Sequence, residues 1–222
     1  MLPPVAIVWP CSLSVDAYVA AGRAVVVPRP DCPRCGGVTS WWSGYRRFVR
    51  AGGVSRALFV PRVRCGACAK TDAMLPAFVF LGRLDVVETV GAVVEAVVTG
   101  VGGVRPVAAA FAVPHSTARG WVRRFAVRAA GWSVAFAALA VELGGEVIAG
   151  VGDVAGNALV AIGAAFEAAR SLVGWDRLGR WRFVSAVSGA TLLATNTNTP
   201  YLVVGRRRFM PPVPSEGTGT GR

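Results

Sequence analysis

The chain has 222 residues, 54% of them apolar, and its 24 Lys and Arg side chains against 12 Asp and Glu give a net charge of +12. This length and apolar content exclude a globally disordered chain and allow one large domain or two to three small ones. The basic excess favours a polyanionic partner, because neutralised phosphates release counterions, over a basic protein that has no such partner.

Residues 1–28 predict an irregular lead-in segment with one or two helical turns around SVDAYVAAG. The opening residues have no early positive charge, several prolines and Asp16, so we expect no secretory signal. A cytoplasmic location is therefore expected. Because thiols stay reduced there, paired cysteines favour a metal site over disulfides.

Two Cys-x-x-Cys pairs lie in the second predicted segment, residues 29–76. Tetrahedral zinc takes thiolate ligands about 2.3 Å away, so two such pairs complete the coordination of one structural Zn²⁺ and leave no open position for a catalytic water. The same ligands suit a rubredoxin-like iron centre, and the alternative to any metal is a set of independent core or redox cysteines. The predicted ligands are Cys32, Cys35, Cys65 and Cys68.

The residues between the two pairs predict a β-hairpin, and with the metal a zinc ribbon. Its arms are VTSWWSGYRRFV and VSRALFVPRVR, and its turn is RAGG. We expect Gly36, Gly37 and Gly66 to permit the tight positive-φ turns that point the thiolates inward. The fifth cysteine, Cys11, has no partner and is interpreted as a small buried hydrophobe.

The predicted hairpin is rich in arginine and in aromatic side chains. Guanidinium groups among aromatic rings suit phosphates and stacked bases; the alternative is a solvated arm whose aromatic rings pack on its own small core. We predict DNA contacts on the hairpin from Arg46, Arg47 and Arg50.

Residues 80–131 predict a helix-turn-helix unit. Apolar residues recur at helical spacing from Leu84 to Thr99, GVGGV then ends this helix, and Pro106 suits the first position of the next one. AVP gives a tight turn, after which HSTARGWVRRFAVR resumes the helical spacing.

The last of these helices carries two separate stripes. The apolar stripe comprises Ala118, Trp121, Val122 and Phe125. The polar stripe, with a spacing of four, comprises His115, Arg119 and Arg123. A helix buried on one side and basic on another is what a recognition helix requires, since the major groove admits one helix and guanidinium groups read guanine edges. The alternative is an amphipathic core helix with a solvated basic face.

Within this helix we assign base reading chiefly to Arg119, and phosphate contacts to Arg124 and Arg128 on a neighbouring face. Ser116 either contacts DNA or caps the helix. The predicted DNA contacts on the helix are His115, Ser116, Arg119, Arg123, Arg124 and Arg128.

Residues 132–204 are rich in Ala and Val and predict two packed helices, followed by a strand or short helix that begins at RWRFVSAV. The apolar stretch from Val147 contains Asp153 and Asn157, and a carboxylate at the membrane midplane costs about 2.5–3.5 kcal/mol, so a packed soluble helix is favoured over a membrane span. We expect this region to form a homo-oligomer. Residues 205–222 predict a disordered basic tail. The expected fold class is α+β, mainly α.

The motifs CPRCGG, GYRRFVR and VRCGACAKT, followed by RPVAAAFAVPHSTARGWVRRF, resemble the N-terminal zinc-ribbon and helix-turn-helix region of bacterial insertion-sequence transposases, over about residues 29–131. The stretch WPCSLSVDAYVAAGRAVVVPRPDCPRCGG is similar to the opening of an uncharacterised family of transposase-related proteins from high-GC actinobacteria. The resemblance implies DNA binding, with the four paired cysteines as metal ligands. It ends there, because strand transfer needs several carboxylates holding two metal ions on a sizeable mixed sheet, and the Ala-rich chain after Trp132 is too short for one.

No catalytic arrangement is evident in the sequence. The one histidine lies on the predicted recognition helix, and GVGGV lacks the strand and the acidic residue of a dinucleotide-binding turn. We therefore predict a non-enzymatic, zinc-containing protein that binds double-stranded DNA and no membrane, transposon-associated or similar to a transcription regulator. The alternatives are an accessory or truncated transposase subunit whose catalytic core lies on another chain, and a zinc-ribbon adaptor that binds an acidic protein.

Overall fold

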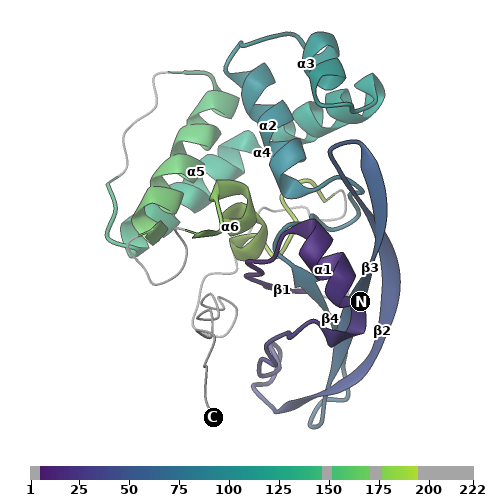
Figure 1. Ribbon diagram of the computed structural model, residues 1–222. Coiled ribbons are helices and arrows are strands. Elements are labelled where there is room, and N and C mark those ends of the chain that lie inside the picture. The colour runs from purple at the N-terminus through teal and green to yellow at the C-terminus, as the bar shows by residue number, and fades with distance from the viewer. Residues whose placement is uncertain (1–5, 147–151, 171–176, 195–222) are drawn as a thin grey trace, which may run out of the picture.

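The computed structural model describes residues 6–146, 152–170 and 177–194 (Figure 1). Within these ranges the chain is α+β, as predicted, with a four-stranded mixed sheet and six α-helices. The predicted tail at 205–222 and the last part of region 132–204 lie outside the described residues.

The sheet has the strand order β1-β4-β3-β2. Strands β2 (Thr39–Ala51) and β3 (Val54–Cys65) form a long antiparallel hairpin. Its two-residue turn consists of Gly52 and Gly53, both with positive φ, 56° and 78°, which is the conformation of the turns that match the twist of paired strands. The predicted hairpin and its turn are confirmed.

Two further strands enlarge the sheet beyond this hairpin. Strand β4 (Thr71–Pro76) pairs antiparallel with β3, and β1 (Ile7–Trp9) pairs parallel with β4. The helix α1 (Val15–Ala21) follows β1 and begins at Ser14, whose hydroxyl accepts a hydrogen bond from the Ala17 amide at 3.1 Å. Ile7 to Trp9 of the lead-in segment are therefore a strand of the sheet rather than irregular, and α1 confirms the helical turns predicted around SVDAYVAAG.

The other helices lie on one side of the sheet (Figure 1). They are α2 (Val87–Val98), α3 (Val104–Ala110), α4 (His115–Glu142), α5 (Val154–Arg170) and α6 (Arg180–Val187), and a short 3-10 helix, η1 (Gly22–Ala24), follows α1. The sequence around RWRFVSAV is thus helical. Pro106 is the third residue of α3 rather than its first.

Helix α2 begins three residues later than predicted, because the chain before it pairs with the hairpin. The Arg50 amide donates to the Leu84 carbonyl at 2.8 Å, and the Val86 amide donates to the Arg50 carbonyl at 3.0 Å. Leu84 to Val86 therefore extend along the outer edge of β2 instead of forming the first turn of the helix.

Helix α4 is a single helix of 28 residues. The domain boundary predicted between residues 131 and 132 falls inside it, so the basic segment and the first Ala-rich segment are two halves of one element. Helix α5 packs along α4. Among the described residues α4 is also the one helix whose length and composition would allow it to cross a membrane, a property that core helices of soluble proteins share.

One cluster of buried side chains joins the sheet to the helices. It includes Val49 and Leu58 of the hairpin, Val90 of α2, and Phe125 and Trp132 of α4. The hairpin therefore shares its core with the helical region. Cys11 belongs to the same cluster, and burial raises the pKa of its thiol to about 11, as expected for a small buried hydrophobe.

Candidate metal centre and basic surface

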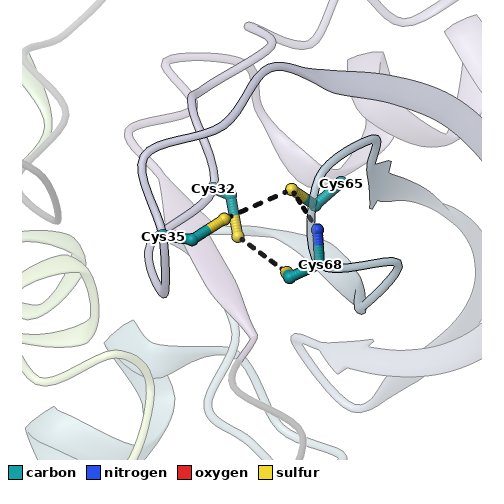
Figure 2. A group of neighbouring side chains, drawn as sticks. All are labelled: Cys32, Cys35, Cys65 and Cys68. Carbon is teal, nitrogen blue, oxygen red and sulfur yellow. Dashed lines mark hydrogen bonds between the residues drawn. The ribbon is translucent and has the colours of Figure 1, made fainter.

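The four paired cysteines converge at one end of the hairpin (Figure 2). Their sulfur atoms all lie within 4.8 Å of one another, with Sγ–Sγ distances of 3.7 Å for Cys32 and Cys68 and 3.5 Å for Cys35 and Cys65. In a tetrahedron with metal–sulfur bonds of about 2.3 Å, the sulfurs are about 3.8 Å apart. The cluster therefore has the size of a four-thiolate coordination shell for one metal ion.

The two Cys-x-x-Cys loops have the same backbone design. In each, the residue after the second cysteine donates its amide to the carbonyl of the first: Gly36 to Cys32 at 2.9 Å and Ala69 to Cys65 at 3.1 Å. Both donor residues have left-handed backbone, with φ of 72° and 56°. The prediction for Gly66 was wrong, because the left-handed position of the second loop is Ala69.

Gly37 allows the two loops to approach closely. A Cβ atom at this position would lie 3.0 Å from the Ala67 Cβ and 3.2 Å from the Cys65 sulfur. The role of Gly37 is therefore to make room, whereas Gly36 provides the left-handed turn that was predicted for both.

The sulfurs influence one another electrostatically. The Cys68 amide, 3.5 Å from the Cys65 sulfur, is the main cause that lowers the pKa of Cys65 to about 7. For Cys35 the Gly37 amide acts to lower the pKa, but the neighbouring sulfurs, Cys65 first, and desolvation outweigh it and raise the pKa to about 12. The Cys35 thiol therefore loses its proton less readily than the Cys65 thiol; a bound metal ion would favour the thiolate form of its ligands.

A buried ion pair holds the first loop against β4. Arg34 donates two hydrogen bonds of 2.9 Å to the carboxylate of Asp72, whose side chain is 3% exposed. Sequence reasoning missed this pair. Asp72 is the one acidic residue between Cys32 and Leu84, and its isolation among arginines was the signal available in the sequence.

The N-terminal half of α4 presents its predicted stripes on separate sides. Ala118, Trp121 and Phe125 are buried and Val122 is half-buried. The predicted contact residues His115, Ser116, Arg119 and Arg123 are exposed, whereas Arg124 and Arg128 are half-buried. The polar stripe therefore faces solvent, while Trp121 and Phe125 hold the opposite side of the helix in the core.

Ser116 does not cap this helix. The cap position is Pro114, no side chain bonds to the first helical amides, and Ser116 lies in the first turn with its side chain exposed. Of the two roles predicted for Ser116, capping is wrong, and contact with DNA stays a prediction.

The three hairpin arginines differ in their surroundings. Arg46 is exposed. Arg47 is half-buried, donates to the carbonyls of Phe80 at 3.3 Å and of Arg83 at 2.5 Å, and its burial lowers its pKa. The structure thus corrects the expectation that Arg47 faces solvent, because alternate side chains of β2 point to opposite sides of the sheet and this one points inward.

Arg50 is also held internally. Its guanidinium makes a bidentate ion pair with Asp85, at 2.6 and 2.9 Å, and the Asp85 side chain is 3% exposed. The hydrogen bond with Asp85 raises the pKa of Arg50. Arg50 therefore fixes the hairpin to the chain that leads into α2, and its expected place on a phosphate-binding surface is corrected too.

The N-terminal half of α4 is rich in arginine. No acidic residue occurs from residue 96 to residue 141, a stretch that contains five arginines. Elsewhere, acidic side chains pair with arginines, as Glu88 does with Arg182. In the described ranges, no carboxylate lies within ion-pair distance of Arg119 or Arg123.

Residues 32–124 match a protein family described as a domain of unknown function (DUF6431). No curated protein and no solved structure matches the chain, and none of the comparisons supports a relationship to transposases. The matched segment runs from Cys32 to Arg124. It therefore contains the whole cysteine cluster and the first ten residues of α4.

Proposed function

We propose that this chain is a non-enzymatic protein that binds double-stranded DNA through the N-terminal half of α4, with one structural Zn²⁺ stabilising the hairpin. The observation that carries the proposal is the solvent-facing stripe of His115, Arg119 and Arg123, which has no acidic neighbour along 46 residues of sequence, from 96 to 141. Such a surface favours a polyanion, because each phosphate contact releases condensed counterions.

The arrangement of three helices supports insertion of α4 into a major groove. Helices α2, α3 and α4 contact one another, and the turn of residues 111–114 joins α3 to α4. Ala118, Trp121 and Phe125 anchor one side of α4 in the shared core. A helix held in this way, with basic side chains at its N-terminal end, has the form of the second helix of a helix-turn-helix unit.

Zinc suits the cysteine cluster because a four-thiolate tetrahedron is its usual structural site, and coordination would hold the two Cys-x-x-Cys loops together at the end of the hairpin. Iron fits the same ligands. Elemental analysis of freshly purified, reduced protein distinguishes the two metals.

Selection of bound sequences from random duplexes tests DNA recognition. A bidentate contact of Arg119 with guanine is worth about 1–3 kcal/mol of discrimination, so Arg119→Ala should relax the preference at one base position. Arg124→Ala should weaken binding without changing the preferred sequence. Arg170→Ala is the charge-matched control. Arg170 and its ion-pair partner Glu167 both lie on α5, away from the polar stripe of α4.

Two outcomes contradict this assignment. A wild-type protein that selects no sequence excludes a recognition helix, as does an Arg119→Ala profile identical to that of wild type. Salt-dependent binding to an acidic protein, with no binding to any duplex, would instead support the adaptor function. A neighbouring reading frame with an acidic triad would identify the chain as part of a divided transposase.

We further propose that a second copy of the chain binds α4 along the valine seam, Val127, Val134 and Val141. Val127, Val134 and Val141, 80%, 73% and 62% exposed, follow one another at intervals of seven residues, with Ala130 and Ala137 at the intervening positions. Apolar residues at this spacing form the seam of a helix pair, and the segment between Arg128 and Glu142 carries no charge that would oppose it.

Sedimentation analysis of the zinc-loaded chain tests the dimer. Val134→Glu places a carboxylate in the middle of the seam and should yield monomers, whereas Val160→Glu, at an exposed position of α5, should leave the association unchanged. A wild-type protein that is monomeric at all concentrations contradicts the proposal and leaves DNA binding by one copy to be tested separately.

A further inference from the structure

A hollow of about 350 Å³ lies between the hairpin and the chain that follows α1. Its walls are Arg23 and the segment from Val25 to Val27 and, on the hairpin, Trp41, Ser43, Phe59 and Pro61. The volume is at the lower end of the range of small-molecule sites. The hollow lies on the hairpin, and none of its lining residues belongs to α4 or to the cysteine cluster.

The walls of the hollow combine flat apolar surfaces with one cation. Trp41 pairs with Val63 across the hairpin, and since residues two apart on a strand share a face, Trp41 lies on the same side of the sheet as Phe59 and Pro61. The Trp41 side chain is 47% exposed, so a large part of its ring is open to a ligand. Arg23 is held over the Phe59 ring, 5.3 Å from its centroid.

The charge around the hollow favours a polyanion. Residues 16–72 contain ten basic and three acidic side chains, and two of the acidic ones, Asp16 and Asp72, pair with Arg56 and Arg34. Internal ion pairs and hydrogen bonds engage several of these arginines, Arg47 and Arg50 among them, whereas Arg23 and Arg46 are exposed and have no carboxylate partner within the part of the chain that the structure describes.

We propose that this hollow binds one unpaired nucleobase of a single-stranded nucleic acid. The base stacks against the exposed ring of Trp41, and Arg23 at the wall binds the adjacent phosphate. Stacking on aromatic side chains beside arginine tolerates any base, because every base has a π-face. The site goes beyond the duplex surface of α4: it would let the protein hold duplex and single strand at the same time.

Fluorescence anisotropy with labelled oligothymidylate and oligouridylate tests the site in the full zinc-loaded chain. Trp41→Ala should weaken single-strand binding about 5- to 150-fold, the factor that corresponds to a stacking contribution of about 1–3 kcal/mol. Arg23→Ala should weaken it and reduce its salt slope by about 0.7, the value of one lost phosphate contact on a single strand. The ratio of the two oligonucleotide affinities identifies DNA or RNA as the ligand.

Trp42→Ala is the matched control. Trp42 is also exposed, but Arg64 already lies over its ring, 4.5 Å from the centroid, and Trp42 does not line the hollow. This variant should bind the single strands like wild type. Arg119→Ala with Arg123→Ala should lose duplex binding and keep single-strand binding, so failure of the α4 proposal and failure of this one give different results.

Val26→Asp provides a second test, which remains valid even if the Trp41→Ala protein does not fold. Val26 is 87% exposed at the hollow, so its replacement leaves the core intact, and the new carboxylate should repel the strand and weaken binding at least about fivefold. Wild-type affinity in Val26→Asp, or in a Trp41→Ala protein with full metal content, overturns the proposal. Absence of oligonucleotide binding by the wild type overturns it as well.

Discussion

Replacement of Arg50 by alanine separates a structural arginine from a DNA-binding one. In the structure Arg50 makes both of its short contacts, 2.6 and 2.9 Å, to the carboxylate of Asp85, whose side chain is 3% exposed. Arg50→Ala leaves this carboxylate buried without its partner. Removal of one partner from a buried ion pair costs about 3–5 kcal/mol, whereas an exposed substitution such as Arg46→Ala stays within about 0.5 kcal/mol.

The expected loss is large enough for thermal or urea unfolding of the zinc-loaded chain to measure. For a chain of this size each kcal/mol lowers the melting temperature by about 2–4 °C, so Arg50→Ala should melt roughly 6–20 °C below wild type. Asp85→Asn, introduced into Arg50→Ala, removes the unpaired charge and should recover part of the loss. If Arg50→Ala is no less stable than Arg46→Ala, the ion pair has no structural role and Arg50 returns to the candidates for phosphate contact.

Three more predictions concern the cysteine cluster. The purified, reduced chain should hold about one metal ion, and Cys65→Ser should lose both the ion and the order of the two Cys-x-x-Cys loops; elemental analysis that finds no metal in wild type would refute the site. Acidification should release the metal, because protons compete for the thiolates, and a chromophoric chelator follows this release; occupancy that does not change down to strongly acidic pH would exclude thiolate ligation. Gly36→Ala should destabilise the chain by about 1–2 kcal/mol and Ala69→Gly should stabilise it by up to about 1 kcal/mol, because both positions are left-handed. Urea unfolding measures both, and changes of the same sign would contradict the equivalence of the two loops.

The parts of the fold that depend on nearby residues were predictable from the sequence. The two Cys-x-x-Cys pairs and the Gly52-Gly53 turn are local patterns, and the cluster and the hairpin follow from them. Strand β1 was not predictable, because its pairing with β4 joins residues more than 60 positions apart and three apolar residues carry no periodicity.

The candidate surface was predicted in part, for a similar reason. Helical spacing alone separates the exposed Arg119 from the buried Trp121. On the hairpin, alternation shows that Arg46 and Arg47 face opposite sides, but which side is the core depends on distant residues such as Phe80. The end of the predicted recognition helix, at residue 131, was misplaced, because α4 continues to Glu142 through the Ala-rich segment that was assigned to the next region.

Because α4 is one continuous helix, it would determine how two copies of the chain bind a duplex together. A helix of 28 residues is about 42 Å long, and it carries the basic stripe and the valine seam without a joint between them. In a dimer, the rotation of the rigid helix between stripe and seam would therefore fix the relative orientation of the two polar stripes, because no flexible linker separates them. One residue inserted between Arg123 and Val127 would turn the polar stripe by about 100° relative to the valine seam and would lengthen the helix by only about 1.5 Å. A dimer of this kind would bind two half-sites on the duplex, one per copy. The number of residues between stripe and seam would then determine the distance between these half-sites.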